Sequence, residues 1–223
     1  MAENKIRKVA IVDDHAMMRD GLAQLVAGLE GYECCWAAGN AAAALAGVEK
    51  ERPDLLITDM SLPGRNGLEL IKDVLAVAMG LPILVLSMHD ETLYAQRVLR
   101  AGAKGYIMKD ADALKLAEAI TTIADGGIWV SPEMSSKIIQ AFSGQGGKEQ
   151  VEGVHRLTDR EFEIFQLIGE GVSKADISAT LNISPKTVDV HKAHIREKLE
   201  LENAAAVMSY AIRWVEIRKL GSE

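Results

Sequence analysis

Five short apolar runs alternate with segments of helical periodicity in the first 127 residues, and no other feature restricts the fold as strongly. The runs occupy residues 6–12, 32–38, 54–58, 82–86 and 104–108. Continuous apolar runs of this length are typical of strands in a parallel sheet that is covered on both faces. Strands that alternate with helices indicate an α/β domain. We therefore predict a flavodoxin-like (βα)5 domain with a parallel sheet of strand order 2-1-3-4-5.

The segments between these runs carry apolar residues at every third or fourth position, which predicts five helices. Three helices are expected over residues 16–29, 40–51 and 91–101. The other two are marked by Leu68, Ile71, Leu75 and Met79, and by Leu114, Ala117, Ile120 and Ile123. Pro63-Gly64 predicts a turn shortly after the third strand.

Reactive side chains stand where four of the five expected strands end. The second strand ends in Ala37-Ala38, but the others end in Asp13-Asp14, Asp59, Ser87 and Lys109. In the predicted strand order these four strands are neighbours, so their carboxyl ends converge on one pocket. Each side chain alone could cap a helix, end a strand or lie in solvent. That explanation would have to hold at all four strand ends, so we favour a functional pocket.

The residue types in this pocket indicate phosphoryl transfer. Three crowded carboxylates repel one another, and a bound hard divalent cation would neutralise this repulsion. Mg²⁺ prefers oxygen ligands and often binds one or two carboxylates together with a phosphate. Lys109 offers a point charge for phosphate, Ser87 a hydroxyl donor, and a carboxylate the nucleophile. A dinucleotide-binding fold is rejected, because the first turn reads Asp13-Asp14-His15 instead of G-x-G-x-x-G.

Charge and cysteine content restrict the environment in which the chain works. The net charge is −7 and no part of the chain is basic overall, so charge alone does not indicate nucleic-acid binding. Cys34 and Cys35 are adjacent, and we expect small buried apolar residues in a reducing compartment. No apolar run reaches the roughly 18 residues of a transmembrane helix, and the first residues show no signal-peptide pattern. We expect a cytoplasmic protein with no membrane partner.

The rest of the chain has a different pattern, which predicts a second, all-α domain. Residues 132–142 are expected to form a short helix with Ser131 as its N-cap, and the small, polar residues 143–150 to form a flexible linker. Four helices should follow: one after the capping box 158–161, one over 173–180, one capped by Ser184, and one over 203–217. The expected domains are 1–129 and 156–223, joined by the helix and linker of 130–155.

The third of these four helices has one apolar face and one polar face. Val188, His191, Ile195 and Leu199 recur at helical spacing and should pack inward. The opposite face could enter a DNA major groove. Its candidate DNA-contacting residues are Lys186, Thr187, Asp189, Val190, Lys192, Ala193, His194 and Arg196, with Lys174 as a phosphate contact from the preceding helix. Asp189 would repel phosphate but could accept from a cytosine amino group. A helical protein-interaction module is the alternative.

The strand-end motifs also resemble those of a known family. Residues 12–15, 57–64, 86–87 and 105–109 are similar to the receiver domain of bacterial two-component response regulators. The resemblance covers about residues 5–127. It implies that Asp59 is the phospho-acceptor, that Asp13, Asp14, Asp59 and the backbone carbonyl of Ser61 hold Mg²⁺, and that Ser87 and Lys109 bind the phosphoryl group.

The same resemblance implies that Tyr106 is a switch residue, whose ring swings inward when Ser87 moves. One departure lies at Asp110, because many receivers have a proline there after a cis peptide bond, and a cis bond before another residue is costly. Residues 157–201 resemble the helix-turn-helix of the NarL/FixJ (LuxR-type) subfamily, through the motifs at 157–161, 173–178 and 184–191. The family resemblance suggests that the last helix forms a homodimer contact, with core packing as the competing explanation.

The sequence therefore predicts a two-component response regulator and not an enzyme, with at most slow autodephosphorylation. A sensor histidine kinase would phosphorylate Asp59 with Mg²⁺, and this would control dimerisation and binding to double-stranded DNA; RNA polymerase is a further candidate partner. One alternative is a phosphorylation-independent DNA-binding regulator with a vestigial receiver. An Asp-nucleophile phosphatase would need a second Asp two residues after the nucleophile, where this chain has Ser61.

Overall fold

The computed structural model describes residues 6–62, 65–142 and 153–220. The chain forms two compact units, residues 1–146 and 147–223, and each is described here by itself. The turn expected at Pro63-Gly64 and the linker expected over 143–150 lie outside the described residues.

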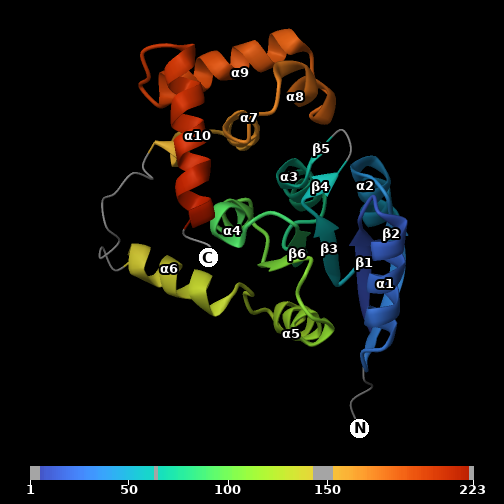
Figure 1. Ribbon diagram of the computed structural model, residues 1–223. Helices are drawn as coiled ribbons and strands as arrows, with labels where there is room; N and C mark the ends of the chain where they lie inside the picture. The colour runs from blue at the N-terminus through green and yellow to red at the C-terminus, as the bar shows by residue number, and fades with distance from the viewer. Residues whose placement is uncertain (1–5, 63–64, 143–152, 221–223) are drawn as a thin grey trace. The chain divides into compact units, whose positions relative to one another are not determined.

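The first unit is built on a five-stranded parallel sheet with the order β2-β1-β3-β6-β7 (Figure 1). The strands are β1 (Arg7–Val12), β2 (Tyr32–Ala38), β3 (Leu55–Asp59), β6 (Ile83–Ser87) and β7 (Gly105–Met108). This is the predicted order 2-1-3-4-5, and the predicted fold class is confirmed. β4 (Ser61–Leu62) and β5 (Arg65–Asn66) form a small antiparallel pair that was not predicted, since two-residue strands leave no periodic pattern.

Helices cover both faces of the sheet, with α1 and α5 on one face and α2, α3 and α4 on the other (Figure 1). Their bounds are α1 (Ala16–Ala27), α2 (Ala41–Lys50), α3 (Gly67–Val77), α4 (Glu91–Arg100) and α5 (Ala113–Ala124), followed by α6 (Pro132–Phe142). Alternate strand residues such as Ile11, Ile57 and Leu86 form one core with Val26 of α1 and Ile120 of α5. Because the strands are buried on both faces, their apolar runs are continuous.

Short polar side chains set where these helices begin. Asn40 accepts a hydrogen bond from the backbone N–H of Ala43 at 2.9 Å, and Asp112 accepts one from that of Lys115 at 2.8 Å. Such caps satisfy N–H groups that have no partner inside the helix. Ser131 caps α6 in the same way by accepting from Met134, as its sequence predicts.

Three packing predictions are wrong. Leu114 is 72% exposed, because the buried face of α5 begins at Leu116 instead. Both residues lie three or four positions from residues that do pack inward, so periodicity alone cannot separate them. Met79 is 86% exposed, because α3 ends at Val77. Cys34 and Cys35 are only half-buried, because β2 is an edge strand.

The second unit is helical, as predicted. It contains a short 3-10 turn, η1 (Val154–Arg156), and the helices α7 (Asp159–Gly169), α8 (Lys174–Thr180), α9 (Pro185–Lys198) and α10 (Ala204–Leu220). Its core includes an aromatic cluster in which the Trp214 ring lies 5.7 Å from Phe162 and 5.5 Å from Phe165. Among the described residues, no helix is long and apolar enough to cross a membrane.

Gly67 joins the start of α3 to the segment that follows Asp59. Its N–H donates to the Met60 carbonyl at 2.9 Å, and a Cβ at this position would lie only 2.7 Å from the same oxygen. The backbone of α3 can therefore approach the end of β3 closely only because residue 67 has no side chain.

We predict that Gly67→Ala lowers the free energy of unfolding of the first unit by about 1–3 kcal/mol, as overpacking does. The control is Gly21→Ala, which meets no atom within 4 Å in the middle of α1 and should stabilise by about 0.5–1 kcal/mol. Urea denaturation of both variants measures the difference. Equal stability of the two variants would contradict the close-approach explanation.

Candidate functional site

The sheet register brings the strand-end side chains together. β1 and β3 are paired through Val12 and Thr58, and β3 and β6 through Asp59 and Leu86. The ladder continues beyond the last paired residues, since the N–H of Lys109 donates to the Ser87 carbonyl at 2.8 Å. The carboxyl ends of β1, β3, β6 and β7 therefore lie side by side at one edge.

Lys109 is the centre of this edge. Its Nζ lies 2.7 Å from Asp59 Oδ2 and 2.8 Å from Asp13 Oδ2. The Lys109 side chain is 7% exposed, and the Asp13 and Asp59 side chains are 1% and 3% exposed. Burial alone would lower the pKa of Lys109, but the two carboxylates outweigh it and raise that pKa. Burial raises the pKa of Asp59, against the hydrogen bonds from Lys109 and from the backbone N–H of Ser61.

The outer part of the pocket is acidic and partly open to solvent. Asp14 is exposed, and its carboxylate lies 2.9 Å from His15 Nδ1. Ligand atoms of Asp13, Asp14, His15 and Asp59 all lie within 4.8 Å of one another. Three of these four donors are carboxylate oxygens, which fits a hard cation such as Mg²⁺. His15 was not among the predicted site residues, although its position directly after Asp13-Asp14 was an available signal.

Ser87 and Tyr106 are joined through His89. Ser87 is fully buried, and its Oγ accepts a hydrogen bond from the backbone N–H of His89 at 3.0 Å. Tyr106 is also fully buried, and its hydroxyl donates to the His89 carbonyl at 2.6 Å. Burial raises the pKa of Tyr106 far above its ordinary value. The Tyr106 ring therefore already points inward in this structure.

His89 also reaches the rim of the pocket, where its Nε2 lies 3.1 Å from Ser61 Oγ. His89 was not predicted as a site residue, because nothing in the sequence pattern shows that the loop after β6 turns back toward residue 61. The peptide bond between Lys109 and Asp110 is trans, so the departure from proline leaves Lys109 in the pocket.

The predicted DNA-contacting residues lie on α8 and α9. Val188 and Ile195 of α9 are fully buried, whereas His191 and Leu199 are only half-buried. Lys186, Asp189, Val190, Ala193, His194 and Arg196 are exposed, and Thr187 and Lys192 are half-buried, but the ring of His194 is turned toward Glu161 of α7. The helix begins with Ser184 as N-cap and Pro185 in the first position, as predicted.

Lys174 and Asp189 form an ion pair that the sequence analysis did not predict. Lys174 Nζ, at the start of α8, lies 3.0 Å from Asp189 Oδ2 on α9. Both side chains are about half exposed, so the pair itself stabilises the fold little. The ion pair does, however, engage the ammonium group of Lys174, which was expected to contact phosphate.

Both parts of the chain match known protein families. Residues 9–121 match the response regulator receiver domain, and residues 155–211 match the bacterial regulatory proteins of the luxR family. The transcriptional regulatory protein DegU of Brevibacillus brevis is 33% identical over 231 residues, which covers 97% of this chain and 98% of that protein. The chain is a two-component response regulator of the NarL/FixJ family. The predicted family is thus confirmed.

Further similarities support the assignment of the chain to this family. The oxygen regulatory protein NreC of Staphylococcus carnosus is 34% identical, over 92% of this chain and 97% of that protein. A solved structure of RcsB from Salmonella enterica serovar Typhimurium, bound to a promoter in the presence of the phosphomimetic BeF3⁻, aligns with a TM-score of 0.64 at 26% identity. That alignment covers 93% of this chain and 98% of that one.

We predict that Lys109→Gln lowers the free energy of unfolding of the response regulator by about 3–5 kcal/mol in metal-free buffer, because it leaves two buried carboxylates without their cation. Adding Asp59→Asn should restore part of the loss, since only Asp13 then stays charged there. Denaturant unfolding of the single and double variants measures both effects.

The control is Lys115→Gln, whose partner Asp112 lies at 3.6 Å with both side chains mostly exposed. It should change stability by less than about 0.5 kcal/mol. If Lys109→Gln cost no more than Lys115→Gln, Lys109 would not be the residue that balances the pocket.

Proposed function

We propose that this response regulator controls transcription through phosphorylation of Asp59 by a sensor histidine kinase. One observation carries the proposal: a buried lysine holds two buried carboxylates at the edge where four strands end, with Ser87 beside them. Such an arrangement is costly to fold, since it removes three charges from water. The burial of these three charges is explained if the pocket receives a phosphoryl group.

Asp59 acts as the nucleophile in this proposal. A carboxylate oxygen of Asp59 attacks the phosphorus of a phosphohistidine, the new O–P bond forms, and the N–P bond to imidazole breaks. The imidazole nitrogen leaves with the bonding electrons and takes up a proton. Lys109, already 2.7 Å from Asp59, then balances the added charge as a point cation.

Asp13, Asp14, Asp59 and the backbone carbonyl of Ser61 would hold Mg²⁺. When bound, this cation supplies charge neutralisation to the transferring phosphoryl group. The family match and the cluster of carboxylate donors support the assignment. Asp14, the more exposed of the two N-terminal carboxylates, would meet the ion from the solvent side.

The buried link from Ser87 to Tyr106 is the proposed switch. When the Ser87 hydroxyl turns to donate to a phosphoryl oxygen, its present hydrogen bond from the His89 N–H is disturbed. Tyr106 donates to the carbonyl of the same residue, so the peptide groups on both sides of the His89 Cα respond. His89 lies just before α4, which would carry the change to the surface around α4 and α5.

The output of the switch is binding to double-stranded DNA in the cytoplasm through the exposed face of α9. The luxR-family match over residues 155–211 supports this, as does the promoter-bound structure of RcsB. We propose that phosphorylation favours a homodimer through α10, where Met208 is 50% and Ile217 is 59% exposed. A contact with RNA polymerase would follow at the promoter.

Two other functions remain to be tested against this one. A phosphatase with an Asp nucleophile needs an acid/base two residues later, and Ser61 has no ionisable group there. The family consists of transcription regulators, so at most slow autodephosphorylation is expected. A vestigial receiver would leave DNA binding independent of phosphate.

One experiment separates these functions. The full chain is incubated with Mg²⁺ and a small phosphodonor, and its mass and its DNA binding are then measured. We expect one phosphoryl adduct on the wild type, tighter DNA binding, and neither in Asp59→Asn. An adduct retained in Asp59→Asn contradicts the proposed acceptor, and an adduct without any change in DNA binding favours the vestigial receiver.

We further predict that Asp189→Ala relaxes the sequence preference of DNA binding without abolishing binding. The change removes an acceptor for a cytosine amino group and frees Lys174 for phosphate. The plot of log affinity against log salt should steepen by about 0.9, the value for one added phosphate contact. Competition binding with variant sites and a salt titration measure both effects.

The control for this prediction is Glu170→Ala, which removes the same charge from an exposed position at the end of α7. It should leave both the preference and the salt dependence unchanged. If Asp189→Ala also left the preference unchanged, Asp189 would not read a base.

A further inference from the structure

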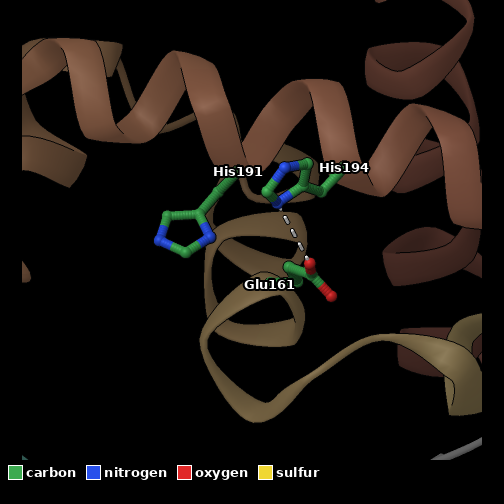
Figure 2. A group of neighbouring side chains, drawn as sticks. All are labelled: Glu161, His191 and His194. Carbon is green, nitrogen blue, oxygen red and sulfur yellow. Dashed lines mark ion pairs between the residues drawn. The ribbon is translucent and has the colours of Figure 1, made fainter.

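Two histidines and a glutamate gather between α7 and α9 in the second unit. Glu161 comes from the first turn of α7, and His191 and His194 lie three residues apart on α9. Figure 2 shows the two imidazole rings and the carboxyl group turned toward the same space. One ligand atom from each of the three residues lies within 4.8 Å of the others.

The His191 ring has a nitrogen without a partner. Its Nδ1 is buried and makes no hydrogen bond with any residue that the structure describes. A buried ring nitrogen without a hydrogen bond is costly, and helix packing alone does not require it.

Glu161 has one oxygen in use and one turned toward the histidines. Its Oε2 accepts from Lys198 Nζ and from the backbone N–H of Thr158, both at 2.7 Å. Its Oε1 faces His194 Nδ1 at 3.7 Å, which is too long for a hydrogen bond. The capping box and the ion pair with Lys198 therefore explain one oxygen and leave Oε1 for another partner.

We propose that Glu161, His191 and His194 form a binding site for a divalent transition metal ion of the Zn²⁺ class. Two imidazoles and one carboxylate are a common set of three protein ligands for zinc, with a fourth position for water. Nitrogen donors suit such ions and disfavour Mg²⁺, so the site differs in chemistry from the acidic pocket of the first unit.

The geometry needs only a small adjustment. Ligand atoms around tetrahedral zinc lie about 3.4 Å apart, from bonds of about 2.0–2.1 Å. The His194 side chain is 53% exposed and can turn to close the remaining gap. Lys198 weakens the binding of a cation, because its ammonium group pairs with the same carboxylate. A bound ion would connect α7 to α9 directly.

Zinc binding to the full chain, measured by titration calorimetry in excess Mg²⁺, tests the site. We expect one zinc ion per chain on the wild type and a higher unfolding temperature of the second unit. His194→Ala should weaken zinc binding by more than about 10- to 100-fold, the loss that follows even when an outer-shell partner is removed. The exposed position of His194 keeps this variant folded.

The matched control is Glu170→Ala, which removes an exposed carboxylate from the other end of α7. It should leave the affinity unchanged. Lys198→Gln should bind zinc more tightly, because it removes the opposing charge. No zinc binding by the wild type, unchanged binding by His194→Ala, loss in Glu170→Ala, or equal or weaker binding by Lys198→Gln would overturn the proposal.

Discussion

The contact of Lys109 with Asp13 and Asp59 is the interaction on which the first unit depends. Two carboxylates and one ammonium are almost entirely removed from water there, and each would be unfavourable without the others. Five strands and the helices on both faces fix these three side chains at neighbouring strand ends. The fold thus keeps these three charged side chains in contact, whereas water would hydrate and separate them in an unfolded chain.

The same edge of the sheet connects this charge to the rest of the unit. Ser87 and Tyr106 are fully buried, and they contact the backbone N–H and the backbone carbonyl of His89, respectively. A movement of the Ser87 side chain therefore displaces a hydrogen-bonded, close-packed residue and not solvent. This gives a physical basis for a two-state switch in which the proposed phosphoryl group biases one arrangement.

Much of the fold followed from the sequence, because the receiver-type sheet produces strong local signals. Continuous apolar runs marked all five main strands, and residues such as Ser131 and Thr158 marked helix starts. The strand-end residues could be grouped because strand order decides which ends are neighbours. Leu114 was misplaced because two overlapping stripes on α5 have the same spacing.

The contacts that sequence reasoning missed are those between elements. His89 turns back toward Ser61, and Lys174 pairs with Asp189 across two helices. The capping box predicted the local role of Glu161, but not its contact with Lys198 or the nearby histidines. Such contacts depend on how loops and helices pack, and no local pattern records that packing.

The phosphoryl group is proposed to be attached to Asp59 and to no other carboxylate of the pocket. Borohydride reduces an aspartyl phosphate to homoserine, so reduction of the phosphorylated protein followed by peptide mass spectrometry locates the acceptor directly. Homoserine is expected at position 59. Homoserine at position 13 or 14, with unmodified Asp59, would contradict it.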